Sequence, residues 1–306
     1  MKLDTVYYRG EINKPALVFI HGIGMNKDIW INPSNACILG ERFPLKILLR
    51  KQIQGEGEES TKKNQQCNDL KTTFDDLRQK GYNVITWSQR RPSGPVDSVV
   101  KELNEIIKIT KEMTDSGIIL IGHSRGGLVG RKYLLKRDKA IKALVTISSP
   151  HKGSSIAHIA KYLSPLVSIT EPFVPKGEKG TLSFSIKRIL EFLKSRALKE
   201  LLPDSAFFRN LKDEPLDWVY YISAGGTNPT LLHIYHIYIP DIFEKIIPEK
   251  FYPEEFKRGR GDGLVSAESS KIPWGNEHYN FDLNHAEILF DKGVRDVLAE
   301  AVEKIR

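Results

Sequence analysis

The sequence has little cysteine and no long hydrophobic run. Its two cysteines among 306 residues are Cys37 and Cys67, which excludes a disulfide scaffold and a cysteine-ligated metal site. We expect both as reduced thiols. No segment approaches the about 18 uninterrupted apolar residues of a membrane-spanning helix. Residues 1–10 contain neither the apolar run nor the cleavage site of a secretory signal, so the sequence predicts a cytoplasmic protein.

Internal repeats and low-complexity tracts are also lacking. Hydrophobic residues make up 40% of the chain and charged residues 27%, which is typical of a globular protein. The net charge of +8 permits an anionic partner, but no aromatic–basic ladder or recognition motif is present, so nucleic acid is not expected. Residues 152–212 hold eleven basic and five acidic residues, which predicts transient contact with an anionic lipid surface. The sequence does not indicate an oligomeric state.

Short apolar strands alternate with amphipathic helices along the chain. Helices are expected over residues 70–80, from residue 96 to about 107, over 128–136 and at the carboxyl end, where apolar residues recur with helical spacing. Such alternation predicts an α/β fold with a mostly parallel sheet covered by helices on both faces, and ligands bind at the carboxyl ends of the strands in such sheets. The expected strands cover residues 16–20, 82–87, 118–121, 143–147 and 218–222.

Three segments interrupt this alternation, and the first, residues 31–66, ends in a polar, charged tract that we expect to be a mobile loop. We expect the core to comprise residues 1–153 and 213–306, with residues 154–212 as an inserted helical cap and 227–260 as a second, smaller insertion. Insertions of this length in a compact domain are usually functional or disordered, and the last two segments are too apolar for disorder.

The motif G-x-S-x-G follows the expected strand 118–121 and precedes a helix, as residues 122–126 with Ser124 at the centre. This context is typical of a sharp turn that presents a nucleophilic serine above the edge of the sheet. Serine acyl transfer also needs two backbone N–H donors for the oxyanion. Arg125 N–H is one candidate, and Ile23 N–H, between Gly22 and Gly24 after the first strong strand, is the other.

The serine further needs a base and an acid that orients it. Of the eight histidines, His21 and His123 lie inside the two motifs, where they are expected to orient loops. We prefer His285, just before the last helix, as the base, with His278 as the runner-up. Asp262 lies in a glycine turn between the serine and this histidine, and the order serine, acid, histidine is that of α/β-hydrolases.

Taken together, the chain resembles an α/β-hydrolase of the bacterial lipase and esterase type, and it is similar to the related GPI inositol-deacylases. The resemblance implies ester hydrolysis by Ser124 without a cofactor, and a cap over the site. Some of these lipases hold a structural calcium near the acid and histidine loops, for which Glu287 and Asp291 are candidates. The matching segments are residues 21–24, 122–126, 149–154, 202–211, 261–265 and 283–287.

The expected function is a carboxylesterase or lipase that works through a Ser–His–Asp triad and an acyl-enzyme. A phospholipid or GPI-type deacylase and an acyltransferase on the same fold are alternatives. A non-catalytic binding protein is disfavoured because candidates for all three triad positions are present. The expected substrate-binding residues are three near the motifs and four in the cap, whose apolar faces would line an acyl pocket: His21, Gly22, His123, Phe184, Ile189, Phe192 and Leu193.

Overall fold

The computed structural model describes most of the expected core and less of the insertions. The described residues are 2–38, 40–42, 45–49, 70–156, 158, 196–231, 233–234, 237–238 and 252–305. The cap candidates Phe184, Ile189, Phe192 and Leu193 lie outside them, as does most of the basic segment 152–212. The boundaries of the two insertions and the acyl pocket therefore stay predictions.

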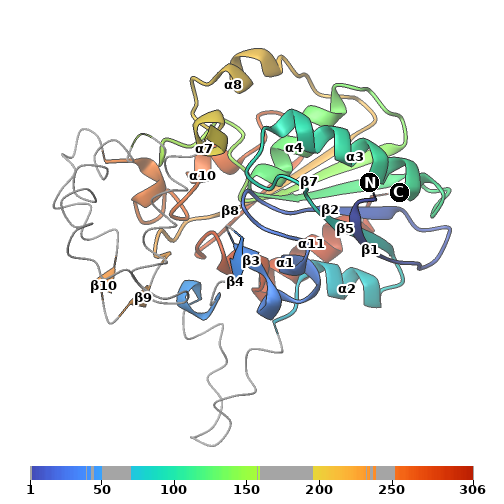
Figure 1. The fold of residues 1–306 in the computed structure, drawn as a ribbon, viewed down its shortest axis with the longest axis horizontal. Helices are drawn as coiled ribbons and strands as arrows, with labels where there is room; N and C mark the ends of the chain where they lie inside the picture. Colours follow the sequence, from blue (N-terminus) through green and yellow to red (C-terminus); the bar gives the residue numbers. More distant parts are fainter. Residues whose placement is uncertain are drawn as a thin grey trace, which may run out of the picture.

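A seven-stranded sheet forms the centre of the described structure (Figure 1). β1 pairs antiparallel with β5, and every other pair in this sheet is parallel. Two short antiparallel pairs lie outside it: β3 (Cys37–Ile38) with β4 (Glu41–Arg42), and β9 (His233–Ile234) with β10 (Ile237–Tyr238). In spatial order the strands of the main sheet are β1 (Asp4–Tyr8), β5 (Asn83–Ser88), β2 (Ala16–Ile20), β6 (Ile118–His123), β7 (Ile141–Ile147), β8 (Tyr220–Gly226) and β11 (Glu277–Phe281).

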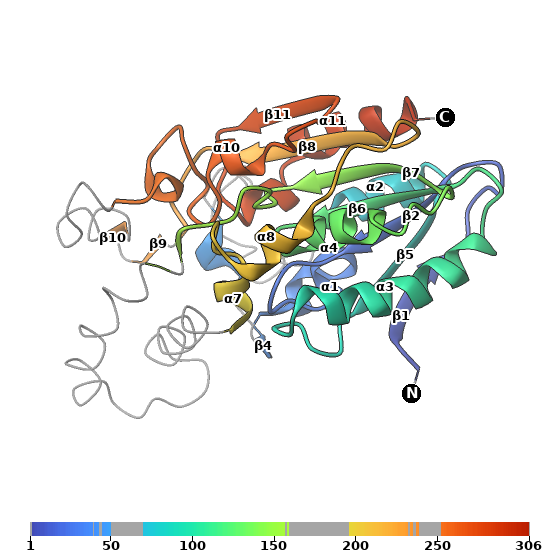
Figure 2. The same ribbon diagram turned by 90° about the horizontal axis from the view of Figure 1, so that it is seen from above.

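Helices cover both faces of this sheet, as Figures 1 and 2 show. On one face α1 (Asp28–Ile31), α2 (Thr73–Gln79) and α11 (Lys292–Glu303) share a buried apolar cluster with Leu17 and Phe19 of β2. On the other, α3 (Val96–Lys111) and α4 (Arg125–Leu134) pack on Val18 and Ile20. Alternate side chains of β2 are thus buried on opposite faces of the sheet, which explains why its sequence is a continuous apolar run. The predicted mostly parallel sheet with helices on both faces is confirmed.

The remaining helical segments are short and lie in the connections. They are α7 (Arg196–Glu200), α8 (Ala206–Leu211), α10 (Ala267–Ser270) and the 3₁₀ turns η1 (Pro33–Asn35), η2 (Leu45–Leu48), η6 (Glu254–Phe256) and η7 (Glu287–Leu289).

The sheet is wider than the sequence indicates, and one strand is displaced. β1 and β11 were not expected, because each lies at an edge of the sheet, pairs on one side and is at most half-buried, so neither has an apolar run. β8 extends to Gly226, four residues beyond the expected end at residue 222. Its last residues are small because neighbours approach closely; a side chain on Gly226 would overlap the Leu283 carbonyl oxygen. A serine, an alanine and two glycines carry little of the hydrophobic signal of a strand.

Residues 154 and 155 form a junction with segments that are distant in the sequence. Ser154 N–H donates to the Leu201 carbonyl oxygen at 2.7 Å, and Ser154 Oγ donates to the Leu264 carbonyl oxygen at 2.7 Å. The buried Glu255 carboxylate accepts from both N–H and Oγ of Ser155, each at 2.7 Å. Hydrogen bonds therefore fix residues 154 and 155 next to residues 201, 255 and 264.

The first turn of α4 lies directly against the end of β2. A side chain on Gly126 would overlap the Ile20 carbonyl oxygen, which is backbone and cannot move aside without disturbing the sheet. Gly130, one turn further along α4, faces only the end of the Leu144 side chain, which can change rotamer. Backbone therefore excludes a side chain at Gly126, whereas only a movable side chain opposes one at Gly130.

We expect Gly126→Ala to lower the free energy of unfolding by about 3 kcal/mol, since the added methyl group must displace backbone. Gly130→Ala is the matched control. Its better helix propensity, about 1 kcal/mol, offsets the rearrangement of Leu144, so stability should change by no more than about 1 kcal/mol. Urea unfolding of both variants measures the difference, and equal losses of stability would show that the contact with Ile20 is not the constraint.

Candidate active site

Ser124 lies at the sharp turn between β6 and α4. Its backbone has φ 52° and ψ −126°, a conformation that a residue with a side chain rarely adopts. Ser124 N–H donates to the Ile147 carbonyl oxygen at 2.8 Å, and Gly127 N–H donates to the Ser124 carbonyl oxygen at 3.1 Å, so both sides of the turn are fixed. Such strain, held by the surrounding structure, is typical of a functional position.

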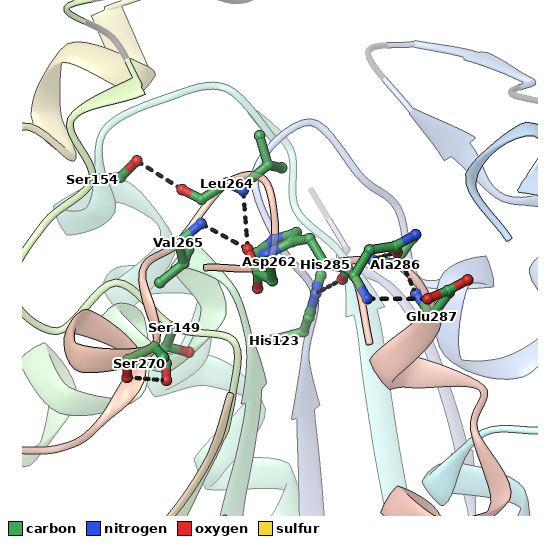
Figure 3. Close-up of polar contacts among 12 residues, drawn as sticks. His123, Ser149, Ser154, Asp262, Leu264, Val265, Ser270, His285, Ala286 and Glu287 are labelled. Carbon is green, nitrogen blue, oxygen red and sulfur yellow. Dashed lines mark hydrogen bonds and ion pairs between the residues drawn. The ribbon is translucent and has the colours of Figure 1, made fainter. Parts of the chain in front are cut away.

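Asp262 and His285 form a buried pair close to this turn (Figure 3). His285 Nδ1 lies 2.8 Å from Asp262 Oδ2, and His285 N–H donates to the Asp262 carbonyl oxygen at 3.0 Å. Asp262 Oδ1 accepts from the backbone N–H groups of Leu264, at 2.9 Å, and Val265, at 2.7 Å. Because the carboxylate is hydrogen-bonded on both oxygens, its orientation toward the imidazole is fixed. The tautomer that satisfies these contacts carries the proton on Nδ1 and leaves Nε2 free to accept one.

His123 joins the serine turn to the histidine loop. Its Nε2 lies 3.1 Å from the His285 carbonyl oxygen, and the two rings are 4.8 Å apart at 49°. Burial lowers the pKa of His123 well below its ordinary value, and the adjacent His285 lowers it further. Neutral His123 therefore donates from Nε2 to the loop that carries His285. This contact brings His285 next to the residue that precedes Ser124.

Asn284 fixes the loop that carries His285, a role that the sequence does not reveal. Its buried amide donates to the carbonyl oxygens of Leu48 and Thr230, both at 2.8 Å, and its Oδ1 accepts from the N–H groups of Ala286 and Glu287. One side chain thus replaces the missing backbone partners of an irregular loop. Its position directly before the candidate histidine is the signal that could have drawn attention to it.

The two expected oxyanion donors lie near the serine. An added Cβ on Gly22 would be 3.2 Å from Ser124 Cβ and 3.2 Å from His123 Nδ1, so the loop after β2 packs against the serine turn. Within the described part of the chain, the N–H groups of Ile23 and Arg125 have no hydrogen-bond acceptor. Two backbone donors without an intramolecular acceptor are what an oxyanion site requires.

The other expected residues have different surroundings. His278, the runner-up base, is half-buried on β11, where its Nδ1 lies 2.9 Å from Ser223 Oγ and its Nε2 lies 3.1 Å from Asn280 Oδ1. His21 and His123 are buried and bond to protein groups. Contact of either side chain, or of Gly22, with a substrate stays a prediction.

The calcium candidates also have protein partners. Asp291 caps α11 by accepting from Val294 N–H at 3.1 Å, and the buried Glu287 carboxylate accepts from Asn284 N–H at 3.1 Å. Over the described ranges, no group of three or more His, Cys, Asp or Glu side chains is arranged to hold a metal ion. The calcium site stays a prediction.

Three buried imidazoles make stability sensitive to acid. Burial lowers the pKa of His21 to about 4 and lowers the pKa values of His123 and His151 well below the ordinary value of 6.5. Because these groups bind protons more readily when unfolded, the unfolding free energy falls as pH drops below about 6.5. Each contributes a slope of up to about 1.4 kcal/mol per pH unit.

His151→Gln should remove one of these contributions, so the unfolding free energy measured in urea at pH 7.5 and pH 5 should depend less steeply on pH. The exposed His158 provides the control, because His158→Gln leaves the buried imidazoles untouched. A slope that is the same in wild type and His151→Gln would contradict this prediction.

Comparisons with known proteins concern the family and the fold. The sequence profile of the family described as palmitoyl protein thioesterase matches residues 17–176, which is just over half of the chain. A search of curated proteins finds no match. Among the described residues, no helix is long and apolar enough to cross a membrane.

Solved structures of two esterases share the fold. The mature lipase BlEst2 of Bacillus licheniformis is 14% identical, with 97% of this chain and 98% of that chain covered and a TM-score of 0.57. The metagenomic carboxyl esterase MGS0156 is 13% identical, with 96% and 76% covered and a TM-score of 0.52. At such identities the likeness concerns the fold. The chain thus has the α/β-hydrolase fold that bacterial lipases and esterases share, and it belongs to the palmitoyl protein thioesterase family.

Proposed function

We propose that this protein is a serine hydrolase that cleaves acyl esters through an acyl-enzyme. The observation that carries the proposal is the buried hydrogen bond between His285 Nδ1 and Asp262 Oδ2, 2.8 Å long, beside the strained turn of Ser124. A doubly fixed carboxylate that holds an imidazole with its Nε2 free is the arrangement needed to activate a serine hydroxyl.

The reaction follows from these positions. His285 Nε2 takes the proton of Ser124 Oγ as the oxygen attacks the acyl carbonyl carbon. Asp262 stabilises the imidazolium that forms, and the N–H groups of Ile23 and Arg125 donate to the oxyanion. The imidazolium then returns its proton to the leaving group, and water, activated by the same imidazole, releases the acid. No cofactor takes part in this sequence.

The substrate class has two candidates. A carboxylic oxoester is the first, and the fold shared with a lipase and a carboxyl esterase is compatible with it. An acyl thioester is the second, and the match to the palmitoyl protein thioesterase profile favours it. The same triad serves both, because a thiolate leaves the tetrahedral intermediate more readily than an alkoxide and needs less help from the imidazolium.

Substitution of the triad tests the mechanism. Ser124→Ala and His285→Ala should each lower kcat by about 10⁶-fold. Asp262→Asn should lower kcat by about 10⁴-fold, since an amide that keeps its oxygen on Leu264 and Val265 N–H turns its NH₂ toward His285 and favours the wrong tautomer. His278→Ala serves as the control and should change kcat by less than about 3-fold, within the ordinary effect of a substitution outside the site. Loss of activity in His278→Ala but not in His285→Ala would reassign the base.

A substrate panel separates the candidates. Hydrolysis of p-nitrophenyl esters from acetate to palmitate should show turnover in the wild type and none above background in Ser124→Ala. Palmitoyl-CoA, assayed with a thiol reagent, reports thioester cleavage. A value of kcat/KM for the thioester above that for the palmitate oxoester would establish the second candidate. An added alcohol that diverts the acyl group into a new ester would identify an acyltransferase. If the wild type cleaves none of these compounds, the proposed function is wrong.

A further inference from the structure

We propose that a buried relay from Arg125 through Gln89 and His21 to the Gly22 carbonyl fixes the peptide whose N–H, that of Ile23, is the first oxyanion donor. The side chains of Gln89, Arg125 and His21 have a positioning role in this relay, since they act through the loop and not on the substrate; the backbone N–H of Arg125 is a separate group. The inference rests on the proposed function and adds residues to its site.

The relay begins at the guanidinium of Arg125, which is fully buried beside the serine turn. Its Nη2 donates to Gln89 Oε1 at 2.7 Å and to the Pro92 carbonyl oxygen at 2.9 Å, and its Nη1 donates to the Gly94 carbonyl oxygen. Arginine has donors only, so the Gln89 amide must turn its oxygen toward Arg125 and its NH₂ the other way. The orientation of the amide is therefore determined by the buried cation.

Gln89 passes this orientation to His21. It directly follows β5, which neighbours β2 in the sheet, and it is 4% exposed. Its Nε2 donates to the His21 carbonyl oxygen at 3.0 Å, and its backbone N–H donates to His21 Nε2 at 3.1 Å. Because Nε2 of His21 accepts a hydrogen bond, the proton of the neutral ring is on Nδ1.

His21 Nδ1 lies 2.9 Å from the Gly22 carbonyl oxygen, to which it therefore donates. That oxygen belongs to the same planar peptide as Ile23 N–H, and in a trans peptide the two point in opposite directions. Fixing the carbonyl therefore fixes the direction of the N–H. Gly22 needs this restraint because a glycine beside the peptide bond lets the peptide plane rotate more easily than any other residue would.

The segment that contains Gln89, residues 89–94, also fixes the chain on the other side of Ile23. Gly24 N–H donates to the Pro92 carbonyl oxygen at 2.8 Å, the oxygen that Arg125 also contacts. Ile23 thus lies between two points that are tied to residues 89–94, one at His21 and one at Gly24. Arg125 supplies the second oxyanion donor from its own backbone, so one residue links both donors of the site.

The guanidinium of Arg125 donates its hydrogen bonds to neutral acceptors, one of which is the Gln89 amide oxygen. In the described residues, no carboxylate lies within ion-pair distance of the guanidinium, and the oxygens that it contacts belong to an amide and to backbone carbonyls. Burial lowers the pKa of Arg125 to about 10, which leaves the side chain charged at neutral pH. The charges of Glu200 and Glu102 favour the charged form of Arg125 from beyond ion-pair distance, but its hydrogen bonds go to neutral acceptors. Loss of the Gln89 oxygen should therefore leave a buried donor of the guanidinium unpaired.

Two substitutions of Gln89 test the proposal. Gln89→Met removes both hydrogen bonds of the side chain at nearly constant volume. Gln89→Glu keeps an acceptor for Arg125, with a new ion pair that supports the fold, but places an oxygen against the His21 carbonyl oxygen. Thr110→Val is the matched control, because it removes a buried hydrogen bond, 2.8 Å from Thr110 Oγ1 to the Ile106 carbonyl oxygen, within α3.

The measurements are kcat and KM for the best p-nitrophenyl ester and the Ki of a trifluoromethyl ketone, which forms a tetrahedral oxyanion on Ser124. Both Gln89 variants should lose about 10- to 100-fold in kcat and a similar factor in Ki, with KM within about 3-fold, because loss of a whole oxyanion donor costs about 10²- to 10³-fold. Thr110→Val should lower Tm and leave kcat and Ki unchanged.

A fluorophosphonate that labels Ser124 gives the fraction of active enzyme, to which all rates are normalised. Normalised kcat and Ki within about 3-fold of wild type in both Gln89 variants would overturn the relay, since that is below the effect of one weakened donor. A loss of kcat in the Gln89 variants with an unchanged Ki for the trifluoromethyl ketone would also overturn the relay. Wild-type enzyme that neither hydrolyses an ester or thioester nor reacts with the fluorophosphonate would overturn the proposed function itself, before any variant is compared.

Discussion

The site depends on direct contact between the backbone of the serine turn and the backbone at the end of β2. Gly126 lies against the Ile20 carbonyl oxygen with no room for a side chain between them. This contact brings Ser124 beside the loop that follows β2, and it brings the start of α4 to the carboxyl edge of the sheet. The positions of both proposed oxyanion donors follow from it, because one is in each of the two segments that meet there.

The polar groups around this contact divide into two kinds. His21, His123 and His151 are held neutral by burial, and each has at least one ring nitrogen in a hydrogen bond to another protein group. His285 differs because a carboxylate contacts its ring. Only an imidazole with such a partner is equipped to carry a positive charge in a buried site. In the proposed mechanism, histidine therefore provides both the rigid connections and the group that transfers the proton, and the carboxylate of Asp262 makes the difference.

Much of the core follows from local pattern. The apolar runs of β2 and β6 and the helical face of α3 are buried as their periodicity predicts, because those elements contact the core over their whole length. Local pattern does not reveal β1 and β11, because an edge strand is stabilised mainly by its one neighbour, which is far away in the sequence: β1 pairs with β5 and β11 with β8.

The site divides in a similar way. Ser124 and Asp262 lie in motifs with recognisable local chemistry, and the order of the residues along the chain pointed to His285. Gln89 and Asn284 carry no such motif, since their importance comes from partners up to 236 residues away, such as Leu48 for Asn284. Arg125 is the clearest case, because arginine is among the residues least often buried. Its side chain could be assigned a role only after the strand order brought residues 89–94 next to it.

The junction at Ser154 and Leu201 has a consequence for how this chain can change. A backbone hydrogen bond joins Ser154 to Leu201, so two points 47 residues apart in the sequence lie next to each other. The entropy of closing such a loop grows slowly with its length, at about 0.6 kcal/mol for each doubling. A change in the number of residues between Ser154 and Leu201 should therefore cost the fold little, so the length of this part of the chain can vary in evolution while the sheet and its helices are kept.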